Sequence, residues 1–145
     1  MPVRHLVEEN SSLLAFYFFG KVTLEEIERA IGRIAADSKT GITYQSVLVF
    51  HGSTDLSRIG PDELKHIKSV LRISYDDASI ERPAGAIVVD GSLDAKIITP
   101  LWKAMCDADS EMDVHYRFFI DIAPALAWLD VVETPALEAI LKDPN

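Results

Sequence analysis

The chain has 145 residues, of which 48% are hydrophobic and 26% are charged, with a formal net charge of −9. This length fits one domain, and the composition is that of a globular protein rather than a disordered one. The negative charge argues against nucleic acid as a general partner, because neutralising phosphates requires clustered Lys and Arg side chains. The single cysteine, Cys106, cannot form a disulfide within the chain. The longest apolar run is far shorter than the ~20 residues of a membrane-spanning helix, and the N-terminus lacks the features of a signal peptide, so we expect a cytoplasmic protein.

The first third of the chain predicts two strands and a helix. Val3–Glu8 is a weak strand, and Leu13–Phe19 is apolar at both alternating positions, as in a central strand covered on both faces. Thr23 and Glu26 have the spacing of a capping box at the start of a helix. Apolar residues then follow at helical spacing, and Gly41 is the predicted stop.

The middle of the chain predicts two more buried strands, each followed by a helix. Val47–Phe50 and Ala86–Val89 are short apolar runs. Pro61 suits the first position of the second helix. The third helix should run from Leu93 to about Ala108, but Pro100 lies inside it. We therefore expect a break or kink there, because proline removes a helical hydrogen bond and clashes with the preceding turn.

The last part of the chain predicts an edge strand and two short helices. Val114–Ile120 alternates between apolar and polar residues, as on a half-exposed strand. After a single turn comes a helix that contains Ala125–Leu129, and Thr134-Pro135 starts a final one. The order β-β-α-β-α-β-α-β-α-α predicts a single α/β domain with right-handed crossovers. We expect a single-layer, mostly parallel sheet of about five strands, with one antiparallel N-terminal strand and four to five covering helices.

This order, with the strand after Tyr44, the segment Gly85–Asp90 and the closing Ala125–Leu129, resembles the STAS (SpoIIAA-like) superfamily. The chain looks closest to the bacterial branch of small stand-alone proteins with no assigned activity. The resemblance covers nearly the whole chain and implies the fold more strongly than a function. The superfamily fold is also likened to CRAL-TRIO lipid-binding domains, which keeps an apolar ligand among the alternatives.

The resemblance also implies a phosphorylation site. In anti-anti-sigma factors of the superfamily, a serine in an Asp-Ser-x-Gly motif opens the helix after the third strand and is phosphorylated by a partner kinase. The corresponding loop here offers Ser53, Thr54 and Ser57 around Asp55, but it lacks the Asp-Ser-x-Gly sequence.

The loop from His51 to Ser57 is the first candidate site that the residues themselves indicate. It follows a central strand, and open α/β sheets bind ligands at the carboxyl ends of their strands. The helix start at Pro61 would direct backbone N–H groups toward an anion in this loop. The alternative is a solvated loop in which Ser, Thr and Asp form turns. A catalytic set of His51, Asp55 and a loop serine is also conceivable, but no Gly-x-Ser-x-Gly elbow is present.

A second candidate is a basic stripe on the second helix, which could bind an acidic protein or an anionic headgroup. It consists of Lys65, Lys68 and Arg72. The alternative is the ordinary polar face of an amphipathic helix.

We predict no metal site and no cofactor. Acidic residues alternate after the third helix, but the pattern lacks the Gly and Glu positions of an EF-hand; these residues are Asp107, Asp109, Glu111 and Asp113. The histidines and Cys106 have no metal-ligand spacing, and no nucleotide-binding glycine motif is present.

These absences favour a non-enzymatic module that binds a protein partner or has a regulatory role, through the His51–Ser57 loop and the basic stripe. A homo-oligomer is possible. The alternative is a carrier or sensor of a small apolar or lipid-like ligand. It is suggested by Pro100, which could hold the third helix off the sheet, and by aromatic residues: Phe16, Tyr17, Phe18, Phe19, Trp102 and Trp128. We expect Ile97, Leu101 and Met105 to fill the space under that helix, which would favour the first interpretation.

Overall fold

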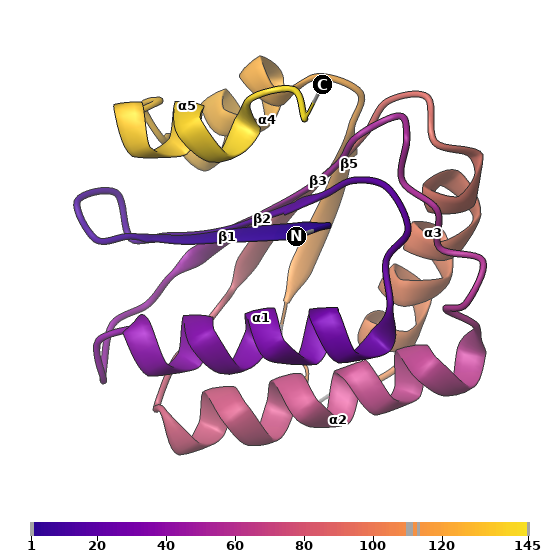
Figure 1. Cartoon of the computed structure of the whole chain (residues 1–145). Coiled ribbons are helices and arrows are strands. Elements are labelled where there is room, and N and C mark those ends of the chain that lie inside the picture. The colour runs from indigo at the N-terminus through magenta and orange to yellow at the C-terminus, as the bar shows by residue number, and fades with distance from the viewer. Residues whose placement is uncertain (1, 110–111, 113, 145) are drawn as a thin grey trace.

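One mixed β-sheet forms the centre of the molecule, and helices cover both of its faces (Figure 1). The computed structural model describes residues 2–109, 112 and 114–144. The strands are β1 (Val3–Glu8), β2 (Leu13–Phe18), β3 (Gln45–Phe50), β4 (Ala84–Val89) and β5 (His115–Phe119). The helices are α1 (Leu24–Asp37), α2 (Pro61–Asp77), α3 (Leu93–Asp107), α4 (Ile122–Leu129) and α5 (Pro135–Leu141). The predicted α/β class and the predicted order of elements are confirmed.

The strands lie in the sheet in the same order as in the chain, β1-β2-β3-β4-β5. β1 is antiparallel to β2, and the other neighbouring pairs are parallel. The three runs that are apolar on both faces form the centre of the sheet, and the alternating strand β5 lies at one edge, as predicted. From β2 to β5, each strand is added to the same edge of the growing sheet. Right-handed crossovers between these parallel strands therefore place α1, α2 and α3 on the same face of the sheet.

Alternation along β2 shows how the sheet separates two cores. Leu14, Phe16 and Phe18 belong to the larger core, which the sheet forms with α1, α2 and α3. Ala15 and Tyr17 point the opposite way, into the smaller core that α4 and α5 cover. A strand with such residues on both faces can only be stable inside the sheet, because either face would otherwise expose apolar area to water.

The predicted starts of α1 and α2 are confirmed, but the predicted stop of α1 is wrong. The Thr23 N–H donates to Glu26 Oε1 (3.1 Å), and Thr23 Oγ1 accepts from the Glu26 N–H (3.4 Å), so the capping box is complete. α1 ends at Asp37, before Gly41, where the Ser38 hydroxyl donates to the carbonyl of Ile34 (2.6 Å). Gly41 lies in the following loop with φ +79°.

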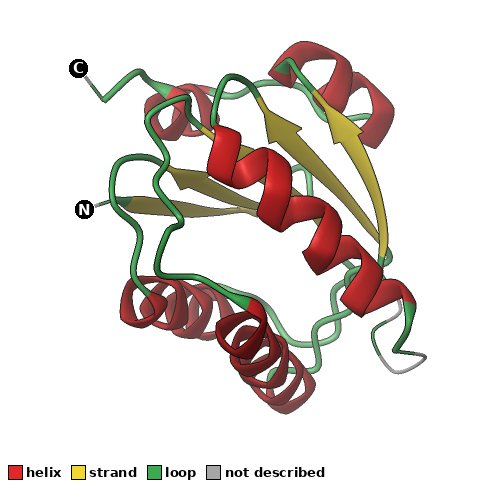
Figure 2. Ribbon diagram, turned by 90° about the vertical axis from the view of Figure 1, so that its right-hand side faces the viewer, coloured by secondary structure: helices red, strands yellow, loops and turns green. Residues whose placement is uncertain are grey.

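Of the break or kink that we expected in α3, the break is wrong. The helix is continuous from Leu93 to Asp107 with Pro100 inside it, and it crosses the front of the view in Figure 2. Pro100 is exposed, and the carbonyl that would accept its missing N–H belongs to Lys96, which is also exposed. Water can therefore satisfy that carbonyl. Inside the same turn, the Thr99 hydroxyl donates to the Ala95 carbonyl (2.7 Å).

Candidate functional site

The His51–Ser57 loop forms a network of local turns. Ser53 Oγ lies 2.8 Å from His51 Nδ1 and accepts from the Gly20 N–H (3.1 Å). The Thr54 hydroxyl is buried and donates to the carbonyl oxygens of Phe18 (3.0 Å) and His51 (2.6 Å). Thr54 therefore fastens the loop to β2 and is closed to a kinase, whereas Ser53 and Ser57 are exposed. Phosphorylation at either serine stays a prediction.

Asp55 does not orient His51 as a catalytic pair would require. Its carboxylate accepts from the Ser57 N–H (2.9 Å), and hydrogen bonding from Ser57 lowers the pKa of Asp55. His51 Nε2 lies 3.5 Å from Asp143 instead. The Ser53 N–H donates to His51 Nδ1 (3.1 Å), the same atom that Ser53 Oγ contacts. Hydrogen bonds between such near neighbours are typical of a turn.

The basic stripe on α2 is partly neutralised by the acidic turn after α3. Asp109 Oδ2 lies 3.0 Å from Lys68 Nζ and 3.6 Å from Arg72 Nη1. Lys65 is exposed. Of the other acidic residues in that turn, Glu111 and Asp113 lie outside the described residues. Asp109 therefore has a structural role, because it lies within ion-pairing distance of two of the three predicted cations on α2.

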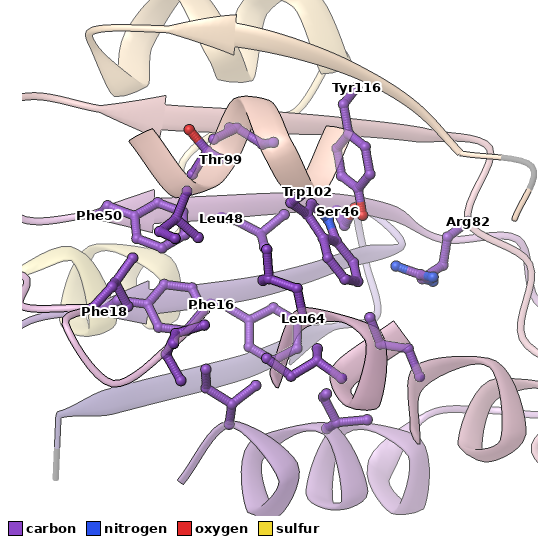
Figure 3. A pocket seen from close by; sticks show the side chains of 18 of the residues that line it. Phe16, Phe18, Ser46, Leu48, Phe50, Leu64, Arg82, Thr99, Trp102 and Tyr116 are labelled. Atoms are coloured by element: carbon purple, nitrogen blue, oxygen red, sulfur yellow. The ribbon is translucent and has the colours of Figure 1, made fainter. Parts of the chain in front are cut away.

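A buried apolar cavity lies between the sheet and the helices α1, α2 and α3 (Figure 3). Its volume is about 80 Å³. One water molecule needs roughly 10–15 Å³ of such space, so the cavity has room for several water-sized groups. Strands β2 and β3 contribute Phe16, Phe18, Leu48 and Phe50, α2 contributes Leu64, Ile67, Leu71 and Tyr75, and α3 contributes Ile98, Thr99 and Trp102. A cavity lined in this way stays dry and favours an apolar occupant.

The residues that we expected to fill this space do not do so. Ile97 is 69% exposed and Leu101 is 36% exposed, while Met105 is half-buried beside the larger core. α3 instead buries Ala95, Thr99, Trp102 and Cys106. Ala95 and Thr99 are small, so they leave space where larger side chains would have closed the core. The helical spacing of these four positions was visible in the sequence, but the small and polar members concealed the buried face.

Only part of the predicted aromatic set lines the cavity. Phe16, Phe18 and Trp102 do, and Phe18 stacks on Phe50 with ring centroids 4.5 Å apart. The remaining three aromatic residues belong to the smaller core on the other face of the sheet: Tyr17, Phe19 and Trp128.

One end of the cavity, called the polar end below, adjoins several polar side chains, although the accessible wall itself is almost wholly apolar. Trp102 Nε1 and the Tyr75 hydroxyl are buried there, and neither has a hydrogen-bond partner in the part of the chain that the structure describes. The Arg82 guanidinium lies over the Tyr75 ring, 4.5 Å from its centroid. In Figure 3, Arg82 points toward the indole of Trp102, and the Tyr116 hydroxyl is directed to the same end. Burial raises the pKa of Tyr75, so its hydroxyl stays protonated and able to donate.

Gly85 makes room for this arrangement. A Cβ atom on Gly85 would lie 2.6 Å from Tyr116 Cε1 and 2.9 Å from Ser46 Oγ. Tyr116 therefore packs directly over the backbone of β4. The sequence prediction included neither Arg82 nor Tyr75 nor Tyr116 in a site, because they come from three separate elements that only the tertiary structure brings together.

A surface groove of about 290 Å³ adjoins the polar end. It shares Leu71, Tyr75 and Arg82 with the cavity. These three side chains therefore form the boundary between the buried space and the surface groove. The other charged side chains that line the groove are Arg72, Asp76 and Glu81.

Among the described residues, no helix is long and apolar enough to cross a membrane, and no three His, Cys, Asp or Glu side chains gather in a way that could hold a metal ion. No family profile, curated protein or solved structure matches the chain. The resemblance to the STAS superfamily therefore remains a prediction that rests on the sequence features alone.

Proposed function

We propose that the protein is a non-enzymatic binding module that takes up a small apolar ligand in the cavity under α3. The observation that carries the proposal is the apolar cavity between the sheet and three helices. An unfilled cavity costs roughly 24 cal/mol per Å³, which is about 2 kcal/mol for 80 Å³. A ligand that fills the space recovers contacts that the empty protein lacks.

The hydroxyl groups along the cavity support binding rather than chemistry. The Thr99 hydroxyl donates to the Ala95 carbonyl (2.7 Å), and Ser46 Oγ lies 3.5 Å from the carbonyl of Ala84. Among the described residues, neither hydroxyl has a histidine or a carboxylate within hydrogen-bond distance that could act as a base. A nucleophile needs such a base within hydrogen-bond reach.

Fluorescence of Trp102 provides the test. The chain has two tryptophans, and Trp128 lies in the other core, so the variant Trp128→Phe leaves Trp102 as the only reporter. In this variant we expect hexanol to change the Trp102 emission with a saturable dependence on concentration. We also expect hexanol to raise the unfolding temperature, because it binds only the folded state.

A cavity-filling substitution and a matched control make the test specific. In the Trp128→Phe variant, Leu48→Phe adds volume at the cavity wall and should weaken hexanol binding at least tenfold. Val49→Ile adds a methylene on the opposite face of the same strand and should leave binding unchanged. If hexanol changed neither the Trp102 emission nor the unfolding temperature, the proposal would be refuted.

Binding of a protein partner is the second candidate function. It is supported by the exposed Ser53, Ser57 and Lys65, which lie on the loop after β3 and on α2. If this surface recognises an acidic partner, Lys65→Glu should slow association and weaken its dependence on salt. If the unmodified protein and the Lys65→Glu variant associated with the partner at the same rate at every salt concentration, this second candidate function would be contradicted.

A further inference from the structure

We infer that the occupant of the cavity is a small carboxylic acid, bound as its anion with the apolar tail inside and the carboxylate at the polar end. This inference rests on the proposed function and adds the class of ligand. Three side chains would recognise the carboxylate: Tyr75, Arg82 and Trp102.

The first argument is that the polar end offers donors. An indole N–H and a guanidinium can only donate hydrogen bonds, and a protonated phenol can donate one. Trp102 Nε1 and the Tyr75 hydroxyl are buried and have no partner among the described residues. An unsatisfied buried polar group costs about 1–3 kcal/mol. A ligand group that relieves this cost at Trp102 must be an acceptor.

The second argument is the charge of Arg82. No carboxylate of the described residues lies within ion-pairing distance of its guanidinium, whereas Lys68 and Arg72 on the neighbouring helix both have Asp109. The adjacent carboxylate of Glu81 accepts instead from the Thr43 hydroxyl (3.4 Å). A half-buried cation beside an apolar cavity favours an anionic ligand head, because Arg matches a carboxylate with two parallel hydrogen bonds.

The third argument is the position of these groups between the cavity and the surface groove. Tyr75 and Arg82 line both spaces. The Arg82 guanidinium lies over the Tyr75 ring at this boundary, 4.5 Å from its centroid. Arg82 is thus placed to supply the counter-charge for the head of a ligand whose tail lies in the cavity.

The test compares three probes that share one tail: hexanoate, hexanol and hexylamine. Each is titrated into the Trp128→Phe variant while Trp102 emission is followed. We expect hexanoate to bind at least tenfold more tightly than hexanol, since a charge-assisted hydrogen bond is worth about a factor of ten or more. Hexylamine should bind most weakly, because its ammonium group meets donors and a like charge.

Substitution of Arg82 identifies the group responsible. Arg82→Gln should remove the preference for hexanoate over hexanol, and saturable binding of hexanol by this variant would show that it folds. Arg82→Lys keeps the charge and should retain part of the preference. Arg33→Gln removes one positive charge at an exposed position of α1 that does not line the cavity, and it should change neither affinity.

The outcomes separate this inference from the proposed function. Equal binding of hexanoate and hexanol would overturn the inference while the proposed function stands. A preference for hexanoate that survives Arg82→Gln would overturn the role of Arg82. Failure of all three probes to bind would overturn both the proposed function and the inference.

Discussion

Two buried tyrosines of the larger core differ in what their hydroxyl groups do. The Tyr44 hydroxyl accepts from the backbone N–H of Lys39 (3.1 Å), whereas the Tyr75 hydroxyl has no partner. We predict that Tyr75→Phe raises the free energy of unfolding of the ligand-free protein by about 1 kcal/mol, because it removes an unsatisfied buried group. Tyr44→Phe should lower the free energy of unfolding by about 1 kcal/mol, because it leaves the Lys39 N–H without its acceptor. Urea unfolding of both variants measures the two signs, and a loss of stability in Tyr75→Phe would show that its hydroxyl is satisfied.

Two glycines give a second pair of opposite effects at the scale of single residues. A Cβ atom on Gly85 would meet Tyr116 Cε1 at 2.6 Å, whereas a Cβ atom on Gly32 in α1 meets nothing within 4 Å. Gly85→Ala should therefore cost about 1–3 kcal/mol through overpacking. Gly32→Ala should stabilise by roughly 0.5–1 kcal/mol, because alanine restricts the unfolded chain and favours the helix. Thermal unfolding of the two variants checks the prediction, and a neutral Gly85→Ala would mean that the Tyr116 ring can shift.

At the scale of elements, proline has different roles in α2 and α3. Pro61 occupies the first turn of α2, where no N–H is needed, while Pro100 lies inside the continuous α3. We predict that Pro100→Ala stabilises the protein by about 1–2 kcal/mol, because the Lys96 carbonyl gains a helical donor while the unfolded chain becomes freer. Pro61→Ala should be neutral or slightly destabilising. Urea unfolding separates the two cases, and a destabilised Pro100→Ala would indicate that the proline ring has a packing role.

The elements themselves could be read from the sequence, because their information is local. Runs that are apolar at both alternating positions predicted the central strands, and the capping box at Thr23 predicted the start of α1. The buried face of α3 could not be read in this way. Leu93, Ile97 and Leu101 have the spacing of a buried stripe, yet all three are exposed. The true buried face includes Ala95 and Thr99, which have little side-chain area to mark it.

The candidate site was only partly predictable for a related reason. Phe16, Phe18 and Trp102 could be singled out, because aromatic residues are rare and large. Arg82 lies in the loop between α2 and β4, and Tyr75 is the last buried residue of α2, so neither has a local pattern that distinguishes it from ordinary loop or core residues. Their meeting at the cavity depends on how α2, α3 and the sheet pack, which is information that no short segment of sequence contains.

At the scale of the whole molecule, the larger core contains two buried titratable groups, the Cys106 thiol and the Tyr75 hydroxyl, that make the free energy of unfolding depend on pH. Burial raises the pKa of the Cys106 thiol to about 11 from 9.0, and burial also raises the pKa of Tyr75. Both groups are neutral at physiological pH, and the folded state holds their protons more tightly than the unfolded chain does. Their contribution to stability is therefore complete below pH 9.

We predict that the free energy of unfolding falls as the pH rises from about 9 to 11, because the unfolded state then releases protons that the folded state keeps. Each unit of pKa shift corresponds to about 1.4 kcal/mol, so Cys106 alone contributes a loss on the order of 2 kcal/mol over this window. Urea unfolding at a series of pH values measures the slope. Cys106→Ala should make the slope shallower between pH 9 and 11 and leave it unchanged below pH 9, even though the substitution lowers stability throughout. A slope that is the same in both proteins would show that the thiol is not the group that titrates.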